Sequence, residues 1–468
     1  MKKTKIVCTL GPASSTKKII AAMADAGMNV VRLNFSHGLH EEHAEKIRLV
    51  KEVREEKHIP LPIILDTKGP EFRIKTFKNG KIELKEGDTF SFTTEEVEGD
   101  QHRVGVSYPG LCADMKPGDK ILLNNGLIVF IVKEVKAPDV ICTVEVGGEL
   151  SNRKSMFFPD KELNMVFLSE QDKADLLFGI EQGIDFVALS FVSRAQDVLD
   201  ARQFLNEHGG KDIDIIAKIE NRAGVRNLKE IMEVSDGIMV ARGDLGVEIP
   251  YEELPDTQKG MISSCRIYGK RVITATEMLE SMIHNPRPTR AEISDVANAV
   301  YDGTSAVMLS GETAAGAFPV ESVAAMAKIV ERAENNVEYI QNIDNYAIKN
   351  SSEALSHSAC TLAKDLSAKA IVVCTRTGGT ARMVSRFRPL TPIIGLTTDE
   401  RAYRKLALSW GVQPAMADEY SSVDILFYFA KLAALKSGLV KKGDTIVITG
   451  GTPNGKSGNS SLINVETV

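Results

Sequence analysis

Residues 214–244 read DIIAKIENRAGVRNLKEIMEVSDGIMVARGD, and this stretch carries the pattern that decides the fold. Two short apolar runs, Asp214–Ile219 and Gly237–Ala241, have the length and composition of buried strands. A helical stretch separates them, so the chain forms a strand, a helix and a second strand in that order. This order predicts a βαβ unit in which the two strands are parallel neighbours of one sheet.

The same alternation continues on both sides of this stretch. Ser14 and Ser15 predict the N-cap of a first helix that ends at Gly27, and His43–Val53 predicts a second helix. The apolar runs that predict strands are Thr4–Leu10, Val30–Asn34, Pro62–Asp66, Phe186–Ser190, Asp214–Ile219, Gly237–Ala241, Val272–Thr276 and Ser305–Leu309. Eight parallel βα units are the signature of a (β/α)₈ TIM barrel, and we expect this α/β fold.

The pattern changes at Gly69-Pro70. From Glu71 to about Asn164 the sequence has short alternating β segments and no convincing helix. The pair Asn125-Gly126 lies between two apolar runs and predicts a β-hairpin. We therefore expect a small all-β domain at residues 70–164, inserted into a barrel domain that residues 1–69 and 165–344 form.

The remainder of the chain, residues 345–468, alternates between strands and helices again. This alternation predicts a separate α/β domain of the doubly wound type. The segments that we expect to be regular are the strands Ala370–Thr375, Pro392–Leu396 and Thr445–Thr449 and the helices Asp399–Ser409 and Val423–Ser437.

Composition excludes several classes of protein. The 468 residues are 43% hydrophobic and 26% charged, which argues against a disordered chain, and no apolar run approaches the roughly 20 residues of a membrane-spanning helix. A net charge of −6 argues against nucleic acid as the main partner. Six scattered cysteines, and no signal peptide after Lys3, favour a cytoplasmic protein with reduced thiols.

Polar residues stand where the predicted strands end, and catalytic groups of a (β/α)₈ barrel occupy those ends. They are Arg32, Asn34, Ser36, Asp66, Thr67, Lys68, Lys218, Glu220, Arg242, Asp244, Thr276, Ser310 and Glu312. The carboxylates of Glu220 and Asp244 suit Mg²⁺ or Mn²⁺. Positive charge for a phosphate or carboxylate comes from Arg32, Arg73, Lys218 and Arg242. Phosphoryl transfer needs mainly positioning and charge neutralisation, which this set supplies.

Each of these residues also has an ordinary structural explanation. A Lys–Glu pair two residues apart is most often a solvated ion pair, and an Asp after a strand is most often a helix cap. However, six of the eight predicted strand ends carry such residues, which favours a functional mouth over a set of unrelated caps and ion pairs.

The chain resembles the pyruvate kinases along its whole length. The segments that carry the resemblance are CTLGPAS (Cys8–Ser14), MNVVRLNFSHG (Met28–Gly38), LDTKGPEFR (Leu65–Arg73), IIAKIEN (Ile215–Asn221), SDGIMVARGDLGVEIP (Ser235–Pro250), NPRPTRAEISDVANA (Asn285–Ala299) and MLSGET (Met308–Thr313). The resemblance implies a (β/α)₈ barrel, a β-barrel lid inserted after the third strand and a C-terminal α/β domain. It also implies transfer of the phosphoryl group of phosphoenolpyruvate to ADP, which gives ATP and pyruvate in the final ATP-forming step of glycolysis.

The resemblance implies two cation sites. Glu220 and Asp244 match the ligands of Mg²⁺ or Mn²⁺. The K⁺ ligands match Asn34, Ser36, Asp66 and the carbonyl of Thr67. Glu71 matches an acidic position that accompanies potassium dependence in this family.

The resemblance also implies roles around the reacting atoms. Lys218 matches the lysine that neutralises the phosphoryl group in flight and the enolate left behind, and Arg32 and Arg73 match phosphate-binding arginines. Thr276 matches a threonine of the proton-delivery path, with Ser310 and Glu312 in its relay. The segment that holds the substrate matches Ala241, Arg242, Gly243 and Asp244. The family's nucleotide-binding positions match Pro12, Asn34, His37, Arg73 and Lys154.

Three places depart from the family pattern. Asn124-Asn125 replaces the usual Asp-Asp of the lid hairpin, and Glu277 stands where glutamine is usual beside Thr276. The run SMFFPD at Ser155–Asp160 replaces a usual Gly-Val-Asn-Leu-Pro-Gly run at the second hinge of the lid. None of these changes removes a metal ligand or the catalytic lysine.

The segment TRTGGT in the C-terminal domain follows a predicted strand and precedes a helix, which suits a phosphate. Its members are Thr375, Arg376, Thr377, Gly378, Gly379 and Thr380. In the family the matching loop binds a phosphorylated effector such as a sugar phosphate or AMP, with fructose 1,6-bisphosphate favoured, and Gly450–Ser461 is a second loop that would close over it. The alternative is a plain turn in a domain used only for homotetramer contacts.

Two other functions stay open at this point. One is a lyase or aldolase that binds pyruvate or phosphoenolpyruvate through a metal, and the other is a catalytically weak sugar-phosphate sensor. A requirement for ADP distinguishes the kinase from the lyase or aldolase. Catalytic turnover distinguishes both of these enzymes from the sugar-phosphate sensor.

Overall fold

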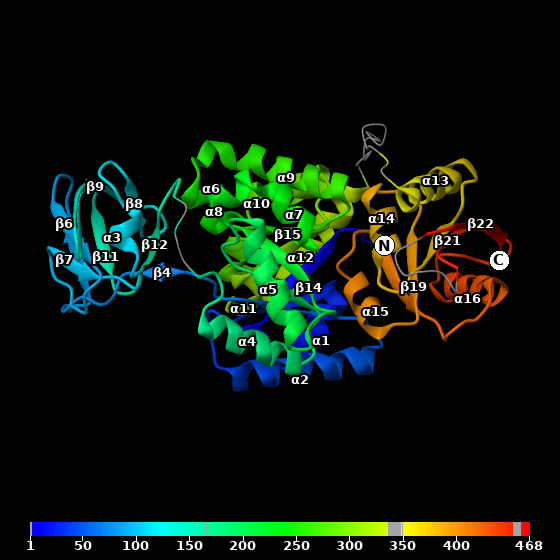
Figure 1. Ribbon diagram of the computed structural model, residues 1–468. Helices are drawn as coiled ribbons and strands as arrows, with labels where there is room; N and C mark the ends of the chain where they lie inside the picture. The colour runs from blue at the N-terminus through cyan, green and yellow to red at the C-terminus, as the bar shows by residue number, and fades with distance from the viewer. Residues whose placement is uncertain (1, 162, 164–165, 336–347, 349, 453–459) are drawn as a thin grey trace.

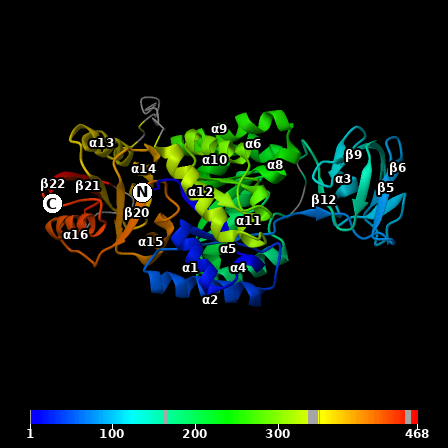
Figure 2. The same cartoon turned by 180° about the vertical axis from the view of Figure 1, so that it is seen from behind.

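A computed structural model describes residues 2–161, 163, 166–335, 348, 350–452 and 460–468 of the chain (Figure 1). Three parts lie in a row: the strands β4–β12 (within residues 72–157) at one end, a barrel in the centre, and the strands β18–β22 (within residues 370–467) at the other end. The view from behind has the same arrangement (Figure 2).

The central part is a closed barrel of eight parallel strands in the order β1-β17-β16-β15-β14-β13-β3-β2. The strands are β1 (Lys5–Thr9), β2 (Val30–Asn34), β3 (Ile63–Asp66), β13 (Phe186–Leu189), β14 (Asp214–Ile219), β15 (Gly237–Ala241), β16 (Arg271–Ala275) and β17 (Ala306–Leu309). Such strands are covered on both faces, and every residue of β14 is buried. The predicted (β/α)₈ fold is confirmed, and each predicted strand end lies within one residue of the observed end.

The neighbours β3 and β13 are far apart in sequence. Ile64 of β3 faces Phe186 of β13, and Asp66 faces Ala188. The inserted segment therefore leaves the barrel and returns to it between two adjacent strands.

Helices surround the barrel (Figure 1). They are η1 (Pro12–Ser14), α1 (Lys17–Ala26), α2 (His40–Lys57), α4 (Glu170–Glu181), α5 (Ala195–Glu207), α6 (Arg222–Arg226), α7 (Leu228–Val234), α8 (Arg242–Glu248), η2 (Tyr251–Glu253), α9 (Leu254–Tyr268), η3 (Glu280–Ile283), α10 (Arg290–Asp302), α11 (Gly311–Ala314) and α12 (Pro319–Glu334). Within the described ranges, no helix is both long enough and apolar enough to cross a bilayer.

The start of α1 differs from the prediction. Thr16 is its N-cap, and the Thr16 hydroxyl accepts a hydrogen bond from the backbone N–H of Ile19. Ser15 instead donates its hydroxyl to the carbonyl of Gly11 at 2.6 Å, and Ser14 ends the short helix before it. The predicted cap at Ser14 or Ser15 was therefore wrong by one or two positions.

The inserted part contains a seven-stranded sheet in the order β4-β12-β8-β9-β10-β6-β7 and a two-stranded sheet β11-β5. Its strands are β4 (Phe72–Arg73), β5 (Lys81–Leu84), β6 (Thr89–Thr93), β7 (Arg103–Gly105), β8 (Lys120–Leu123), β9 (Ile128–Lys136), β10 (Asp139–Val146), β11 (Gly148–Ser151) and β12 (Ser155–Phe157). The expectation of no helix was wrong, because Leu111–Asp114 forms one turn of helix, α3.

The hairpin predicted at Asn125-Gly126 is confirmed as the antiparallel pair β8–β9. Asn124, Asn125 and Gly126 all have positive φ, at 51°, 56° and 82°. Asparagine and glycine adopt this left-handed conformation most easily, which explains why these residues form the turn.

The C-terminal part is a five-stranded sheet in the order β20-β19-β18-β21-β22, in which only β22 is antiparallel to its neighbour. Its strands are β18 (Ala370–Cys374), β19 (Ile393–Thr397), β20 (Val412–Met416), β21 (Thr445–Gly450) and β22 (Leu462–Thr467), and its helices are α13 (Ser351–Asp365), α14 (Gly379–Arg386), α15 (Glu400–Leu406) and α16 (Val423–Lys436). Separate apolar clusters, one including Ile371 and Val384 and the other Val372 and Leu426, pack with opposite faces of this sheet. The predicted α/β domain is confirmed, and α14 is the helix predicted after Thr375–Thr380, although β20, β22 and α13 were not foreseen.

Candidate functional site

The polar residues at the strand ends meet at one mouth of the barrel. Asn34 and Asp66, the last residues of β2 and β3, face each other in register, and Lys218 lies near the end of β14. Asp244 is in the first turn of α8, which begins directly after β15. The parallel strands therefore bring side chains from four segments of the sequence to the same edge.

Asp66 is the centre of a buried network. Its Oδ2 accepts a hydrogen bond from Nε of Arg32 at 2.6 Å, and its Oδ1 accepts one from Nζ of Lys218 at 3.0 Å. Nζ of Lys218 also donates to the hydroxyl of Ser190 at 2.6 Å and lies 3.0 Å from Oε1 of Glu220. Two cations are therefore held at fixed positions by one carboxylate.

The network keeps both Asp66 and Lys218 charged. Burial alone would raise the pKa of Asp66, but Arg32 and Lys218 outweigh burial and lower it below its usual value. Burial alone would lower the pKa of Lys218, but Asp66 and Glu220 outweigh burial and raise it. The ammonium of Lys218 is thus a permanent positive charge at the mouth.

Ser190 belongs to this network although sequence reasoning did not select it. Its hydroxyl donates to the carbonyl of Thr67 at 2.7 Å, and its backbone N–H donates to the hydroxyl of Thr67. Ser190 follows β13 directly, so the rule that strand ends carry the chemistry would have found it.

Glu220 and Asp244 are adjacent carboxylates, and they share a side-chain hydrogen bond. Oε2 of Glu220 accepts from the backbone N–H of Phe191 at 2.6 Å. Burial raises the pKa of Glu220 to about 7, with Asp244 and Asp66 adding to the effect and Lys218 opposing it. Burial also raises the pKa of Asp244. The protein places more negative charge here than Lys218 offsets.

This pair fits a divalent cation. Two carboxylates with raised pKa values in a buried position are stabilised when a cation replaces their shared proton. Mg²⁺ commonly uses one or two protein carboxylates and completes its shell with water and substrate oxygens. Among the described residues, no group of three or more His, Cys, Asp or Glu side chains forms a closed metal cage.

The oxygens predicted for K⁺ lie at the ends of the adjacent strands β2 and β3 and in the turns that follow them. Oδ1 of Asn34 accepts from the backbone N–H of Ser36 at 3.1 Å, which turns the chain after β2. Thr67 follows Asp66 and is buried, and its carbonyl is oriented by Ser190. Hard oxygen donors from a carboxylate, an amide, a hydroxyl and a carbonyl have the chemistry that suits a monovalent cation.

Thr276 stands directly after β16 in an unusual conformation. Its φ is 67° and that of Glu277 is 53°, a region that β-branched residues rarely occupy. The hydroxyl of Thr276 accepts from the backbone N–H of Gly243 at 2.8 Å and donates to the carbonyl of Ala275 at 2.6 Å. These bonds hold the hydroxyl at the start of α8, next to Asp244.

Arg242, which was predicted to supply positive charge for a phosphate or carboxylate, is paired with an acid in the structure. Its Nη1 lies 2.8 Å from both carboxylate oxygens of Asp295, and its guanidinium also donates to the carbonyls of Ala275 and Thr276. The side chain is buried. It fixes the loop after β16 and is neutralised by Asp295.

Glu312 and Ser310 follow β17. The two carboxylate oxygens of Glu312 accept from the backbone N–H groups of Leu279 and Ser310, at 3.0 Å and 2.7 Å. Glu312 is fully buried and connects the two loops. The hydroxyl oxygen of Ser310 is buried and has no hydrogen-bond partner among the described residues, so it is available for another group.

The residues predicted for the nucleotide come from the loops after β1 and β2, from the end of β2 and from the inserted domain. Pro12 and His37 are exposed on the loops after β1 and β2. Arg73 is part of β4, where it pairs with Glu71 at 2.8 Å and donates to the carbonyl of Arg153, next to Lys154. No hydrogen bond within the described ranges joins Lys154 to Pro12 or His37.

The predicted effector loop follows β18 and precedes α14. Gly378 has a φ of 84°, and its N–H donates to the hydroxyl of Thr375 at 3.0 Å. Arg376 and Thr377 are exposed, and the hydroxyl of Thr380 lies 2.9 Å from that of Ser460. The second predicted loop, Gly450–Ser461, is described only at its ends, since residues 453–459 lie outside the described ranges.

Comparisons with known proteins match the chain from end to end. Residues 1–323 match the family model described as pyruvate kinase, barrel domain, and residues 353–466 match that of pyruvate kinase, alpha/beta domain. A pyruvate kinase of Clostridium acetobutylicum is 47% identical over 100% of both chains, and one of Geobacillus stearothermophilus is 49% identical over 100% of this chain and 80% of its own. The crystal structure of a pyruvate kinase from Cryptosporidium parvum superposes with a TM-score of 0.94 at 38% identity, covering 100% of this chain and 96% of that one.

Proposed function

The chain belongs to the pyruvate kinase family of phosphotransferases, and from this premise we propose how its own residues carry out the reaction and its control. The observation that carries the proposal is the ammonium of Lys218, which Asp66, Ser190 and Glu220 hold within 3.0 Å at the mouth of the barrel. A fixed cation beside two carboxylates is the arrangement that phosphoryl transfer between two anions requires.

Lys218 and Arg32 act on the phosphoryl group. The bond between phosphorus and the enol oxygen of phosphoenolpyruvate breaks, and a bond forms from phosphorus to a terminal oxygen of ADP. Lys218 offsets the negative charge of the group in transit and of the enolate that remains. Arg32, oriented by Asp66, binds a phosphate oxygen, and Arg73 binds a phosphate from the lid side.

The same geometry supports two cation sites. Glu220 and Asp244 hold Mg²⁺ or Mn²⁺, and the K⁺ ligands are Asn34, Ser36, Asp66 and Thr67. Bound there, these ions add positive charge close to the phosphate and carboxylate oxygens of the substrates. The enzyme requires K⁺, and the acidic side chain of Glu71 is the one linked to this requirement.

The enolate then takes a proton at its methylene carbon and becomes pyruvate. Thr276 holds its hydroxyl at the mouth, and the hydroxyl of Ser310 has no hydrogen-bond partner in the described ranges, so these two groups form the proton path. Glu312 positions this path through its bonds to two backbone N–H groups. The backbone of Ala241, Arg242 and Gly243 borders the substrate at the start of α8.

We extend the proposal to nucleotide binding and to regulation. Pro12, Asn34, His37, Arg73 and Lys154 bind ADP, and the inserted domain closes over it and excludes water. The loop 375–380 binds a phosphorylated effector, a sugar phosphate or AMP, with fructose 1,6-bisphosphate favoured. We also propose a cytoplasmic homotetramer and a division into residues 1–69 with 165–344, 70–164 and 345–468.

The test is pyruvate formation from phosphoenolpyruvate and ADP by the full-length protein with Mg²⁺. We expect ADP-dependent pyruvate that requires K⁺, and activation by one member of a panel of sugar phosphates and AMP. Pyruvate formed without ADP would favour a lyase, and the absence of pyruvate under every condition would favour a binding protein. Catalysis without any effector response would remove the regulatory part alone.

A further inference from the structure

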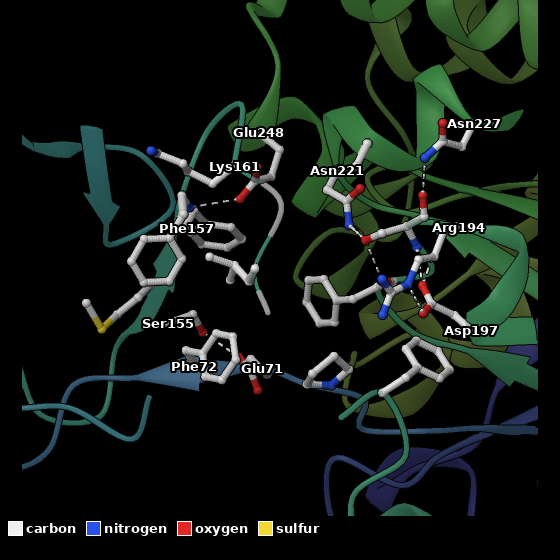
Figure 3. A pocket seen from close by; sticks show the side chains of 18 residues that line it. Glu71, Phe72, Ser155, Phe157, Lys161, Arg194, Asp197, Asn221, Asn227 and Glu248 are labelled. Atoms are coloured by element: carbon white, nitrogen blue, oxygen red, sulfur yellow. Dashed lines mark hydrogen bonds and ion pairs between the residues drawn. The ribbon is translucent and has the colours of Figure 1, made fainter. Parts of the chain in front are cut away.

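A pocket of about 120 Å³ lies at the hinge between the inserted domain and the barrel. One side comes from the hinge segments, with Phe72, Phe157 and Phe158, and from Glu248 at the end of α8. The opposite side comes from the loops after β13 and β14 (Figure 3). Its lining includes Glu71, which we link to the potassium requirement, and none of the other proposed catalytic, cation or nucleotide residues, so the pocket adjoins the mouth on the hinge side.

The apolar part of the lining has the size and shape for one small ring. Its members are Phe72, Met156, Phe157, Phe158, Leu163, Phe167, Phe191 and Ala223. An apolar cavity of about 150 Å³ binds benzene in another protein, so a volume of about 120 Å³ is of the right order for a single ring or a compact branched chain.

The charges in the lining are not balanced. Three carboxylates border the pocket, and two of them have a cation: Glu71 pairs with Arg73 at 2.8 Å, and Asp197 pairs with Arg194 at 3.2 Å. Lys161, the other cation of the lining, is already paired with Asp119, outside the pocket.

Glu248 is the third carboxylate, and it has no cationic partner in the described part of the chain. It is 9% exposed, and the one hydrogen bond described for it comes from the backbone N–H of Phe158 to Oε1 at 3.1 Å. Burial raises the pKa of Glu248 to about 7, and Asp244 adds to this effect while the Phe158 N–H opposes it. A buried carboxylate at the edge of an apolar pocket is stabilised by a cation that brings its own apolar surface.

We propose that this hinge pocket binds a small organic amine, a protonated amino group attached to one ring-sized apolar group. The ammonium pairs with Glu248, and the ring packs among the phenylalanines. Aromatic rings around the carboxylate favour a cation further, because their faces are electron-rich. The side-chain amide of Asn221 already bonds to Gly224 and Ser193, so it borders the pocket without offering a free hydrogen-bonding group to the ligand.

The position of the pocket gives such a ligand a defined effect on the chain. Phe72 lies on the strand that enters the inserted domain, and Phe157 lies on the strand that leaves it. A ligand that touches both of these hinge strands and the barrel loop at Phe191 ties the two domains together. We therefore expect bound amine to slow amide hydrogen exchange at residues 70–73 and 155–158.

The experiment uses the full-length protein and benzylamine as the probe molecule. Benzyl alcohol serves as the neutral isostere and benzoate as the anionic one, and affinities come from ligand-observed NMR titration. We expect benzylamine to bind about tenfold more tightly than benzyl alcohol, since a hydrogen bond to a charged partner is worth that factor, and benzoate not to bind.

Glu248→Gln keeps the shape of the side chain and its bond to Phe158 but removes the charge. We expect this variant to bind benzylamine and benzyl alcohol equally. The matched control is Glu252→Gln, an exposed carboxylate on the same segment, which should retain the preference of the wild type. Ala223→Leu fills the pocket from α6 and should weaken the binding of both benzylamine and benzyl alcohol. Circular dichroism confirms that each variant is folded.

Three outcomes would overturn the proposal. Equal affinity of the wild-type protein for benzylamine and benzyl alcohol would remove the role of the charge. An unchanged preference in Glu248→Gln would place the amine elsewhere. Slowed exchange only at residues outside 70–73 and 155–158 would show that the amine binds at another site.

Discussion

Nζ of Lys218 lies 3.0 Å from Oδ1 of Asp66, a residue 152 positions earlier in the chain. The other oxygen of the same carboxylate holds Arg32 at 2.6 Å. One buried acid therefore orients two cations that come from different strands, and its own pKa is lowered by them. The positions of both cations at the mouth therefore depend on a residue that is itself fully buried.

Asp66→Asn should remove this shared anchor. The amide cannot offset two buried cations, and breaking a buried ion pair costs about 3–5 kcal/mol of folding free energy. We expect the free energy of unfolding in urea to fall by that order and pyruvate formation to be lost. Asp25→Asn, which changes an exposed acid, is the control and should leave both quantities unchanged.

Lys218→Met should abolish phosphoryl transfer while the folded protein still binds Mg²⁺, at a cost of about 3–5 kcal/mol of folding free energy because its buried pair with Asp66 is broken. Methionine keeps the length of the side chain but removes the charge that neutralises the group in transit. The rate of ATP formation and the Mg²⁺-induced shift in melting temperature measure the two effects separately. Lys229→Met, at an exposed lysine, should behave as the wild type. Near-normal turnover of Lys218→Met would refute the assigned role.

Stabilisation by Mg²⁺ should increase with pH. The pKa of Glu220 is raised to about 7 and that of Asp244 is also raised, so without metal these groups favour folding below their ordinary pKa values, and this contribution is lost as pH rises through the raised values. Mg²⁺ binds the deprotonated pair. We expect a small rise in melting temperature at pH 5 and a larger one at pH 8, and an equal rise at both would contradict the assignment.

Glu71→Lys should relax the requirement for potassium. The new ammonium would stand in the hinge beside Arg73 and Ser155, where it places a fixed positive charge near the proposed K⁺ ligands. The activity ratio with and without K⁺ measures the effect. Glu86→Lys makes the same charge change at an exposed position of the inserted domain and should keep the full potassium dependence. An unchanged ratio in Glu71→Lys would count against its role.

Gly378→Ala should weaken the response to effector and leave basal activity intact. Gly378 has a φ of 84°, and an added Cβ would lie 3.3 Å from the side chain of Leu406, which must move by a few tenths of an ångström. The left-handed conformation costs a residue with a Cβ about 1–2 kcal/mol. Gly438→Ala is the control, because its φ is 73° and its surroundings are open. Equal effector activation constants in both variants would place the effector outside this loop.

The barrel was predictable from sequence because its evidence is local. Each strand is a short apolar run that ends in polar residues, and the order of βα units determines the sheet. The strand β20 escaped prediction because Gln413 and Pro414 break its apolar pattern, and proline is tolerated there since β20 is an edge strand. The β22 strand is also an edge strand, and only three of its six residues are apolar.

The sequence was enough to predict which residues belong to the site, but not which partner each of them binds. The residues at strand ends could be found by counting, but the pairing of Arg242 with Asp295 joins positions 53 residues apart, and no local pattern indicates it. The same holds for Glu312, whose two oxygens bind backbone groups of different loops. Such pairings follow from tertiary packing, which brings distant segments into contact after the local elements have formed.

The adjacency of β3 and β13 has an evolutionary consequence. Because the inserted domain leaves and re-enters between two strands that already pair, the barrel closes whether or not the excursion is present. The domain also has its own apolar core, which includes Phe90, Phe92 and Phe130. The insertion is thus a self-contained module on one βα loop, and an ancestor with a short loop at this point would already have been a complete barrel.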